Sequence, residues 1–113
     1  MAQRAHNYLR TYRRRVGLSQ DDVSALLGSE NGSMVARYEL FTRAPSLEAA
    51  LSYSVIFGVP PEELFAGLYE KVERRILRRA KKLSGELATA PNQRSLPERM
   101  AALKAIARPT LRK

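Results

Sequence analysis

Apolar residues recur along the chain at the three- and four-residue spacing of α-helices, and no convincing stretch alternates between apolar and polar residues as a half-buried strand does. Five helices are predicted in the first 65 residues. The first three cover about residues 8–16, 19–27 and 33–40, a fourth follows Ser46, and a fifth opens at residues 59–63. The pattern therefore predicts an all-α protein.

The ends and faces of these helices are also predicted. Ser19 with Asp22 is close to a capping box, and Gly28 follows the second helix as expected at a helix C-terminus. The predicted inner face of the second and third helices comprises Val23, Leu26, Leu27, Val35 and Tyr38. The predicted apolar face of the fourth comprises Leu47, Ala50, Leu51, Ser54 and Val55. We expect both faces to be buried.

Beyond residue 64 the pattern predicts one long amphipathic helix that runs to about residue 87. Its apolar positions, at steps of three and four, are Phe65, Tyr69, Val72, Ile76, Ala80, Leu83 and Leu87. Its opposite face carries Lys71, Arg74, Arg75, Arg78, Arg79, Lys81 and Lys82. Residues 88–94 resemble a linker, and a short last helix from Ser95 would place Met100, Leu103 and Ile106 on one side.

The charge is distributed unevenly along the 113 residues. The chain has 20 Lys and Arg against 11 Asp and Glu, a formal net charge of +9. Residues 1–67 carry seven basic and seven acidic side chains, whereas residues 68–113 carry thirteen and four. We therefore expect a balanced domain at 1–67 and a basic helical extension at 68–113. The excess implies an anionic partner, with nucleic acid ahead of a membrane surface.

Composition argues against several other classes of protein. The chain has no cysteine, so neither disulfides nor a thiolate zinc site are expected, and His6 alone cannot supply a histidine metal cluster. No apolar run is long enough to span a bilayer, and the basic first 15 residues do not resemble a secretory signal. We expect a cytoplasmic protein that is not an enzyme and needs no metal or cofactor.

The second and third helices, joined by a turn at Gly28, form the pattern of a helix-turn-helix. In this arrangement the second helix of the pair enters the major groove of DNA, and its N-terminal residues meet the base edges. Double-stranded DNA is therefore the predicted partner.

Several motifs in order resemble the phage-repressor-like (Cro/CI, xenobiotic-response-element) helix-turn-helix family. They are residues 18–28 (LSQDDVSALLG), 37–39 (RYE), 43–47 (RAPSL) and 57–65 (FGVPPEELF). The resemblance covers about residues 8–65 and implies a five-helix lambda-repressor-like domain that regulates transcription. Phe41 departs from the family pattern, because glycine commonly occupies that position and permits a positive φ.

The resemblance also implies roles for individual residues. Ser33, Met34 and Arg37 lie where the family contacts bases, and Gln20, Asn31 and Arg43 lie where it contacts phosphates. Each has a plainer alternative. Arg37 could instead pair with Glu39 or Glu30, Met34 could belong to the core, and Gln20 could only cap its helix. Glu39 is more often a structural partner than a base contact, and Arg13, Arg14 and Arg15 either follow phosphates or are a solvated helix end.

The long basic helix has three interpretations: a dimerisation helix, a second contact to the DNA backbone, or a face packed within the chain. We favour a homodimer, which would read a palindromic operator with half-sites about 34 Å apart. The leading hypothesis is a sequence-specific regulator, most simply a repressor. The alternative is a DNA-binding antitoxin-like or adaptor module whose C-terminal helices bind a partner protein. Membrane binding ranks low because the apolar face has no Trp.

Overall fold

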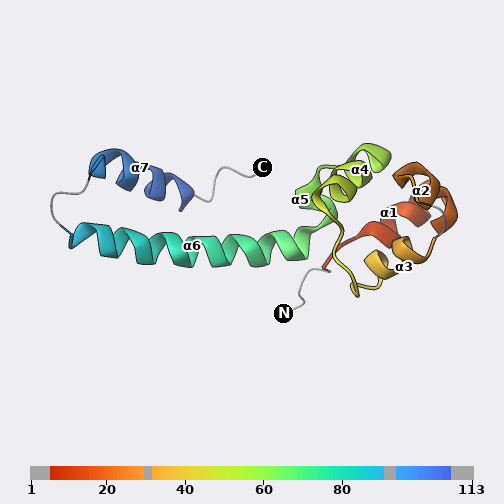
Figure 1. Ribbon diagram of the computed structural model, residues 1–113, viewed down its shortest axis with the longest axis horizontal. Helices are drawn as coiled ribbons and strands as arrows, with labels where there is room; N and C mark the ends of the chain where they lie inside the picture. The colour runs from red at the N-terminus through yellow and green to blue at the C-terminus, as the bar shows by residue number, and fades with distance from the viewer. Residues whose placement is uncertain (1–5, 30–31, 91–93, 108–113) are drawn as a thin grey trace. The chain divides into compact units, whose positions relative to one another are not determined.

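A computed structural model of the chain describes residues 6–29, 32–90 and 94–107, and every regular element in this part is a helix (Figure 1). The helices are α1 (Leu9–Val16), α2 (Gln20–Leu27), α3 (Ser33–Glu39), α4 (Leu47–Phe57), α5 (Pro61–Leu64), α6 (Ala66–Ala88) and α7 (Leu96–Ile106). The all-α prediction is confirmed, and each predicted helix is present within two residues of its expected start. No helix in the described part is long and apolar enough to cross a membrane.

The chain divides into two compact units, residues 1–70 and 71–113, and α6 passes through the boundary. The first unit contains α1 to α5 and the first turn of α6. Its core is built from α1 to α5 and the residue that follows α5, and Leu68 of α6 packs against it. The core residues are Leu9, Val23, Val35, Tyr38, Tyr53, Leu64 and Phe65. Aromatic rings connect α4 to its neighbours, since the Tyr53 ring centroid lies 6.2 Å from that of Tyr38 in α3, and the Phe57 ring centroid lies 6.1 Å from that of Tyr12 in α1.

The predicted inner face of α2 was wrong at one position. Val23 is fully buried and Leu27 packs against the core, but Leu26 is 60% exposed. The buried face of α2 includes Ser24 instead, which is 1% exposed. Because Ser24 is small, α2 can lie close to its neighbours on that side, and Leu26 is left at the rim.

The predicted apolar face of α4 was wrong at three positions, although Ala50 packs against the core as expected. Leu47, Leu51 and Val55 are 76%, 49% and 81% exposed. The helix instead turns Tyr53 into the core, with Ala49, Ala50, Ile56 and Phe57 packed around it. The sequence of α4 offers two apolar faces, and the face with two aromatic rings buries more apolar area, so it is the one that packs inward.

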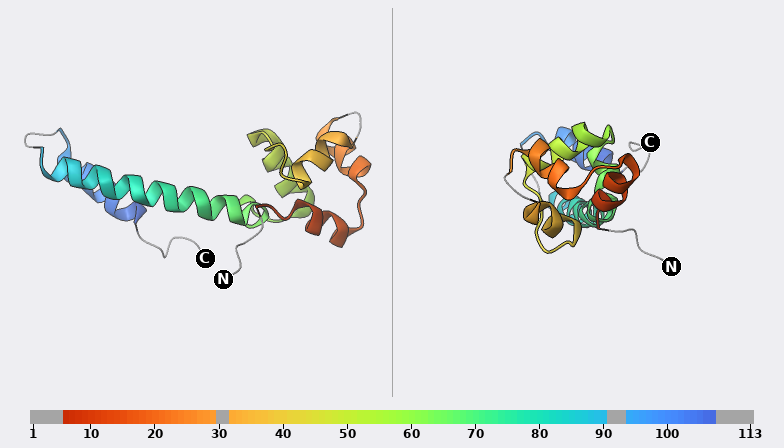
Figure 2. Two further views of the ribbon diagram at one scale, coloured as in Figure 1. Left: turned by 90° about the horizontal axis from the view of Figure 1, so that it is seen from below. Right: turned by 90° about the vertical axis from the view of Figure 1, so that its right-hand side faces the viewer.

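The second unit holds the rest of α6 and α7, and α7 runs back beside α6 (Figures 1 and 2). Ala80 and Leu87 of α6 are 7% and 5% exposed, whereas Val72, Ile76 and Leu83 remain 38–41% exposed. The apolar side of α6 is therefore only partly covered. We call Val72, Ile76 and Leu83 the apolar band of α6.

Local hydrogen bonds fix the start of α2. The Ser19 side chain accepts a hydrogen bond from the Asp22 backbone N–H at 3.0 Å, and the Asp22 carboxylate accepts one from the Ser19 N–H at 2.9 Å. This reciprocal pair is a complete capping box, as the sequence indicated. The hydrogen bond from the Ser19 backbone N–H to the Asp22 carboxylate lowers the pKa of Asp22 below its ordinary value of 3.8, and the Ser19 side chain lowers it further.

Because of the capping box, the first unit should lose stability when the pH is lowered. Because the pKa of Asp22 is lower in the folded state, its contribution is present above the ordinary value and disappears as pH falls through the lowered value. We expect Asp22→Asn to flatten the loss of stability on acidification below about pH 4. Urea unfolding measured at several pH values checks this, and parallel curves for the variant and the wild type would contradict it. Ser19→Ala should remove about 1 kcal/mol at neutral pH.

Candidate nucleic-acid interface

The helices α2 and α3 approach closely at the start of α3. Gly28 ends α2 with a φ of 83°, a conformation that favours glycine, and residues 30–31 of the turn lie outside the described part. A Cβ atom on Gly32 would lie 2.7 Å from Asp21 Oδ1 and 3.2 Å from the Cβ of Gln20. The absence of a side chain at Gly32 therefore brings the N-terminus of α3 against the first turn of α2. Asn31, a predicted phosphate contact, is among the residues that are not described.

The outer face of α3 presents two of the three predicted base contacts. Ser33 and Arg37 are exposed and one helical turn apart, so they lie on the same face, while Val35, Tyr38 and Glu39 are buried on the other. Met34 is half-buried and packs against the core, which agrees with the alternative that it is a core residue. Only part of the Met34 side chain is left for any other contact.

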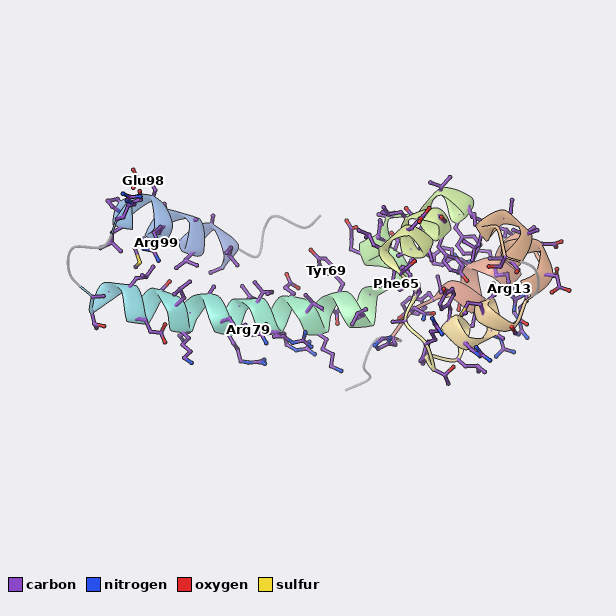
Figure 3. The ribbon with its side chains drawn as sticks, in the orientation of Figure 1. Arg13, Phe65, Tyr69, Arg79, Glu98 and Arg99 are labelled. Carbon is purple, nitrogen blue, oxygen red and sulfur yellow. The ribbon has the colours of Figure 1, made fainter. Side chains whose placement is uncertain are left out.

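A buried ion pair holds the C-terminus of α3 to α1. Arg13 Nε donates to Glu39 Oε2 at 2.6 Å, and Arg13 Nη2 donates to Glu39 Oε1 at 3.1 Å. The two side chains are 11% and 2% exposed. The hydrogen bond from Arg13 to Glu39 raises the pKa of the guanidinium above its ordinary value, against the opposing effect of burial. Figure 3 shows Arg13 among the helices of the first unit.

The same ion pair also organises the entry to α2. The Arg13 Nη1 group donates to the carbonyl of Leu18 at 2.9 Å, and the Gln20 side-chain amide donates to Glu39 Oε1 at 3.2 Å. One cluster of hydrogen bonds thus joins α1, the start of α2 and the end of α3. Glu39 is thus a structural partner that pairs with Arg13 rather than with Arg37, while Glu30, the other alternative partner of Arg37, lies outside the described residues. Arg37 itself has no carboxylate partner among the described residues.

The buried cluster extends to Tyr53 in the core. Tyr53 is fully buried, and its hydroxyl has no hydrogen-bond partner among the described residues. Burial raises the pKa of Tyr53 well above its ordinary value, and the negative charge of Glu39 raises it further. The negative charge of Glu39 is compensated by Arg13.

The loop after α3 contains a residue with a positive φ at the position where the family commonly has glycine. Phe41 has a φ of 66°, although it is not glycine, and its side chain is 52% exposed. The Thr42 N–H and hydroxyl both donate to the Arg37 carbonyl, at 3.0 and 3.2 Å, and hold the loop in this conformation. Arg43, the predicted loop phosphate contact, follows directly and is exposed.

Asn7 anchors the same end of α3 from a position that the sequence analysis missed. Its side chain donates to the carbonyl of Tyr38 at 3.1 Å and accepts from the Leu9 N–H, also at 3.1 Å. Asn7 is 6% exposed, so these bonds satisfy a buried amide. An asparagine two residues before an apolar helical run is a recognisable cap-like signal, but its partner 31 residues away is not visible in the sequence.

Two further basic residues lie beside the start of α2: Arg10, which the sequence analysis did not single out, and Arg14, for which it left a phosphate contact and a solvated helix end as alternatives. A shallow hollow on the surface is lined by Arg10, Arg13, Arg14, Ser19, Gln20 and Asp21. Arg10 and Arg14 are exposed and one turn apart on α1, so both cations face the hollow that contains Gln20. The four-residue spacing of Arg10 and Arg14 indicates that they share one face of α1, but the sequence does not show that this face lies beside α2.

The buried ion pair should dominate the stability of this unit. Arg13→Gln and Glu39→Gln each leave one buried charge without its partner, which costs about 3 kcal/mol or more. We expect each variant to lower the free energy of unfolding by about that amount, measured by urea denaturation. Arg14→Gln, an exposed neighbour on α1, is the matched control and should change stability by less than about 0.5 kcal/mol. Equal effects at positions 13 and 14 would show that the ion pair is unimportant.

Comparison with known proteins supports the sequence interpretation of this unit. Residues 9–64 match the family model described as helix-turn-helix. The matched range begins with α1, ends with α5, and includes the ion pair and the exposed face of α3. Neither the curated proteins nor the solved structures gave a match. Through residues 9–64 the chain belongs to the phage-repressor-like (Cro/CI, XRE) helix-turn-helix family, whose members are DNA-binding regulators.

Proposed function

We propose that the chain is a transcriptional repressor that recognises a specific DNA sequence by placing α3 in the major groove. The observation that carries this proposal is the outer face of α3, where Ser33 and Arg37 are exposed together on a helix whose opposite face is buried. An α-helix fits the major groove, where the four base pairs present distinct donors and acceptors. A domain seated on a promoter in this way blocks access to it, which is the simplest form of repression.

Arg37 is the principal base-reading residue in this proposal. Arg37 is exposed, and Glu39 pairs with Arg13 instead, so we assign the Arg37 guanidinium a bidentate contact with guanine. Ser33 lies one turn earlier and reaches a neighbouring base. Met34 contributes what its packing against the core leaves exposed, in contact with a thymine methyl group.

Phosphate contacts set the register of α3 on the duplex. Gln20 and Arg43 flank α3 from the start of α2 and from the following loop. Asn31, the third phosphate contact in our proposal, lies outside the described residues. Because Glu39 accepts a hydrogen bond from Gln20, the amide of Gln20 is already oriented before DNA arrives. Such contacts supply affinity and position without distinguishing sequences.

A second copy of the chain completes the regulator in our proposal. Val72, Ile76 and Leu83, the apolar band of α6, are 38–41% exposed even with α7 alongside. A second α6 packed on this band would remove the remaining apolar surface from water. Two-fold symmetry would then place two α3 helices on half-sites of a palindrome, about one turn of DNA apart.

Base reading can be separated from phosphate binding with two arginine variants. Selection from a random duplex library should give the wild type a short palindromic consensus. We expect Arg37→Ala to lose about 1–3 kcal/mol of discrimination at one position of each half-site. Arg43→Ala removes the same charge but should weaken binding to all sequences alike and reduce the salt slope by about 1. A wild type with no consensus, or an unchanged consensus for Arg37→Ala, would refute sequence-specific reading by α3.

The assembly is tested by sedimentation. Ile76→Glu places a charge in the centre of the apolar band, so we expect it to convert a wild-type dimer to a monomer at micromolar concentration. Lys82→Glu changes the same helix on its basic side and should leave the dimer intact. A wild type that is monomeric when free and when bound to its operator would exclude the dimer. The apolar band would then favour the adaptor alternative, in which a different protein occupies it.

A further inference from the structure

The basic side of α6 is a dense and uncompensated positive surface. Its seven cations are Lys71, Arg74, Arg75, Arg78, Arg79, Lys81 and Lys82. All but Arg75 are exposed, and none has a carboxylate within 4.0 Å among the described residues. Twelve residues of helix span roughly 17 Å, and the positions follow three- and four-residue steps along one side. Arg79 points away from α7 (Figure 3), so the packing of the second unit leaves this side open.

The helix-turn-helix unit, by contrast, has no positive excess to offer DNA. Residues 1–67 carry equal numbers of basic and acidic side chains. Within them the charge of Arg13 is neutralised by Glu39, and Asp21 lines the same hollow as Arg10 and Arg14. Affinity for a duplex depends strongly on cations that displace counterions from phosphates. The positive charge that this chain can bring to DNA therefore lies mostly on residues 68–113.

We propose that the basic side of α6 is a second DNA-binding surface, which contacts the phosphates of the duplex whose bases α3 reads. The inference rests on the proposed function for its first contact and adds a surface with no base specificity. A 17 Å length of duplex carries about ten phosphate charges, enough to engage several cations of one helix at once. The chain link to the helix-turn-helix unit makes this second contact intramolecular, so it forms at a high effective concentration.

The packing of α6 favours a duplex over a membrane surface. An amphipathic helix binds a membrane by burying an open apolar face. In α6 that face is partly covered, since Ala80 and Leu87 are buried and α7 runs beside the helix (Figures 1 and 2). Phosphate binding does not require an open apolar face, and the exposed cations of α6 remain accessible to phosphate groups.

The experiment compares two triple variants of the full chain that differ only in charge. Lys71→Gln, Arg78→Gln and Lys82→Gln together neutralise three exposed positions on the basic side. Lys71→Arg, Arg78→Lys and Lys82→Arg together keep the charge at the same positions. Glutamine, lysine and arginine have similar helix propensity, and circular dichroism checks that the helix content is unchanged. Affinity is measured over a salt series, and ethylation interference maps the phosphates that each protein needs.

We expect the neutral variant to select the wild-type consensus but to lose up to about 2.7 from its salt slope, or about 0.9 for each phosphate contact. It should also lose a set of interfering phosphates that the wild type and the charge-keeping variant share. Two results would overturn the proposal: a wild-type salt slope in the neutral variant, or a lower slope with an unchanged interference pattern. The second result would mean a diffuse field rather than contacts.

Failure of the proposed function is distinguishable from failure of this inference. If the wild type selects no sequence, reading by α3 is refuted, and the same salt series on a duplex of arbitrary sequence still decides whether α6 binds phosphates. Equal binding of both triple variants to that duplex would refute the second surface alone. Vesicles of anionic lipid serve as the competing anion, and tighter binding to them than to the duplex would also overturn it.

Discussion

The ion pair between Arg13 and Glu39 is the contact on which the geometry of the first unit depends. A carboxylate at the C-terminal end of a helix is unfavourable, because the helix dipole is negative there, and burial makes the charge more costly still. Glu39 is tolerated in that place because Arg13 and Gln20 donate to it from α1 and α2. A competing packing of these helices would leave one of the charges alone, so the pair excludes alternatives as well as stabilising the native arrangement.

This constraint connects the core to the proposed reading surface. Val35 and Tyr38 fix the inner side of α3 by burial, and Glu39 fixes its rotation and its C-terminal end. The position of Arg37 on the outside then follows from its neighbours in the sequence. The proposed recognition surface is therefore positioned by the residues on the opposite side of α3.

Sequence reasoning succeeded where the determining interactions are local. The capping box of Ser19 and Asp22, the glycine end of α2 and the start of α4 after Ser46 each depend on residues within one turn. It failed where the choice lies between faces of one helix. Leu26 and the aliphatic residues of α4 satisfy the helical period as well as the residues that are in fact buried. In α4 the larger rings of Tyr53 and Phe57 decide which face is buried, and they act through the tertiary structure.

The candidate site was predictable to a similar limit. The exposed positions of Ser33 and Arg37 followed from the helical pattern once the helix was placed. The partner of Glu39 did not, because Arg13 is 26 residues distant and the arginine nearest in sequence, Arg37, was the alternative considered. The backbone at Phe41 was expected to be unusual on the basis of the family pattern, but the hydrogen bonds of Thr42 that hold it became visible only in three dimensions.

The exposed aliphatic row on α4, formed by Leu47, Leu51 and Val55, bears on how copies of this protein behave in concentrated solution. Rows of this kind attract one another, and the net charge of +9 opposes that attraction by keeping molecules apart. Salt shortens the range of the repulsion to about 8 Å at physiological ionic strength, but it leaves the apolar attraction in place. We therefore expect the free protein to resist aggregation best at low ionic strength. A protein whose molecules attract one another through opposite charges behaves in the opposite way, because salt screens that attraction.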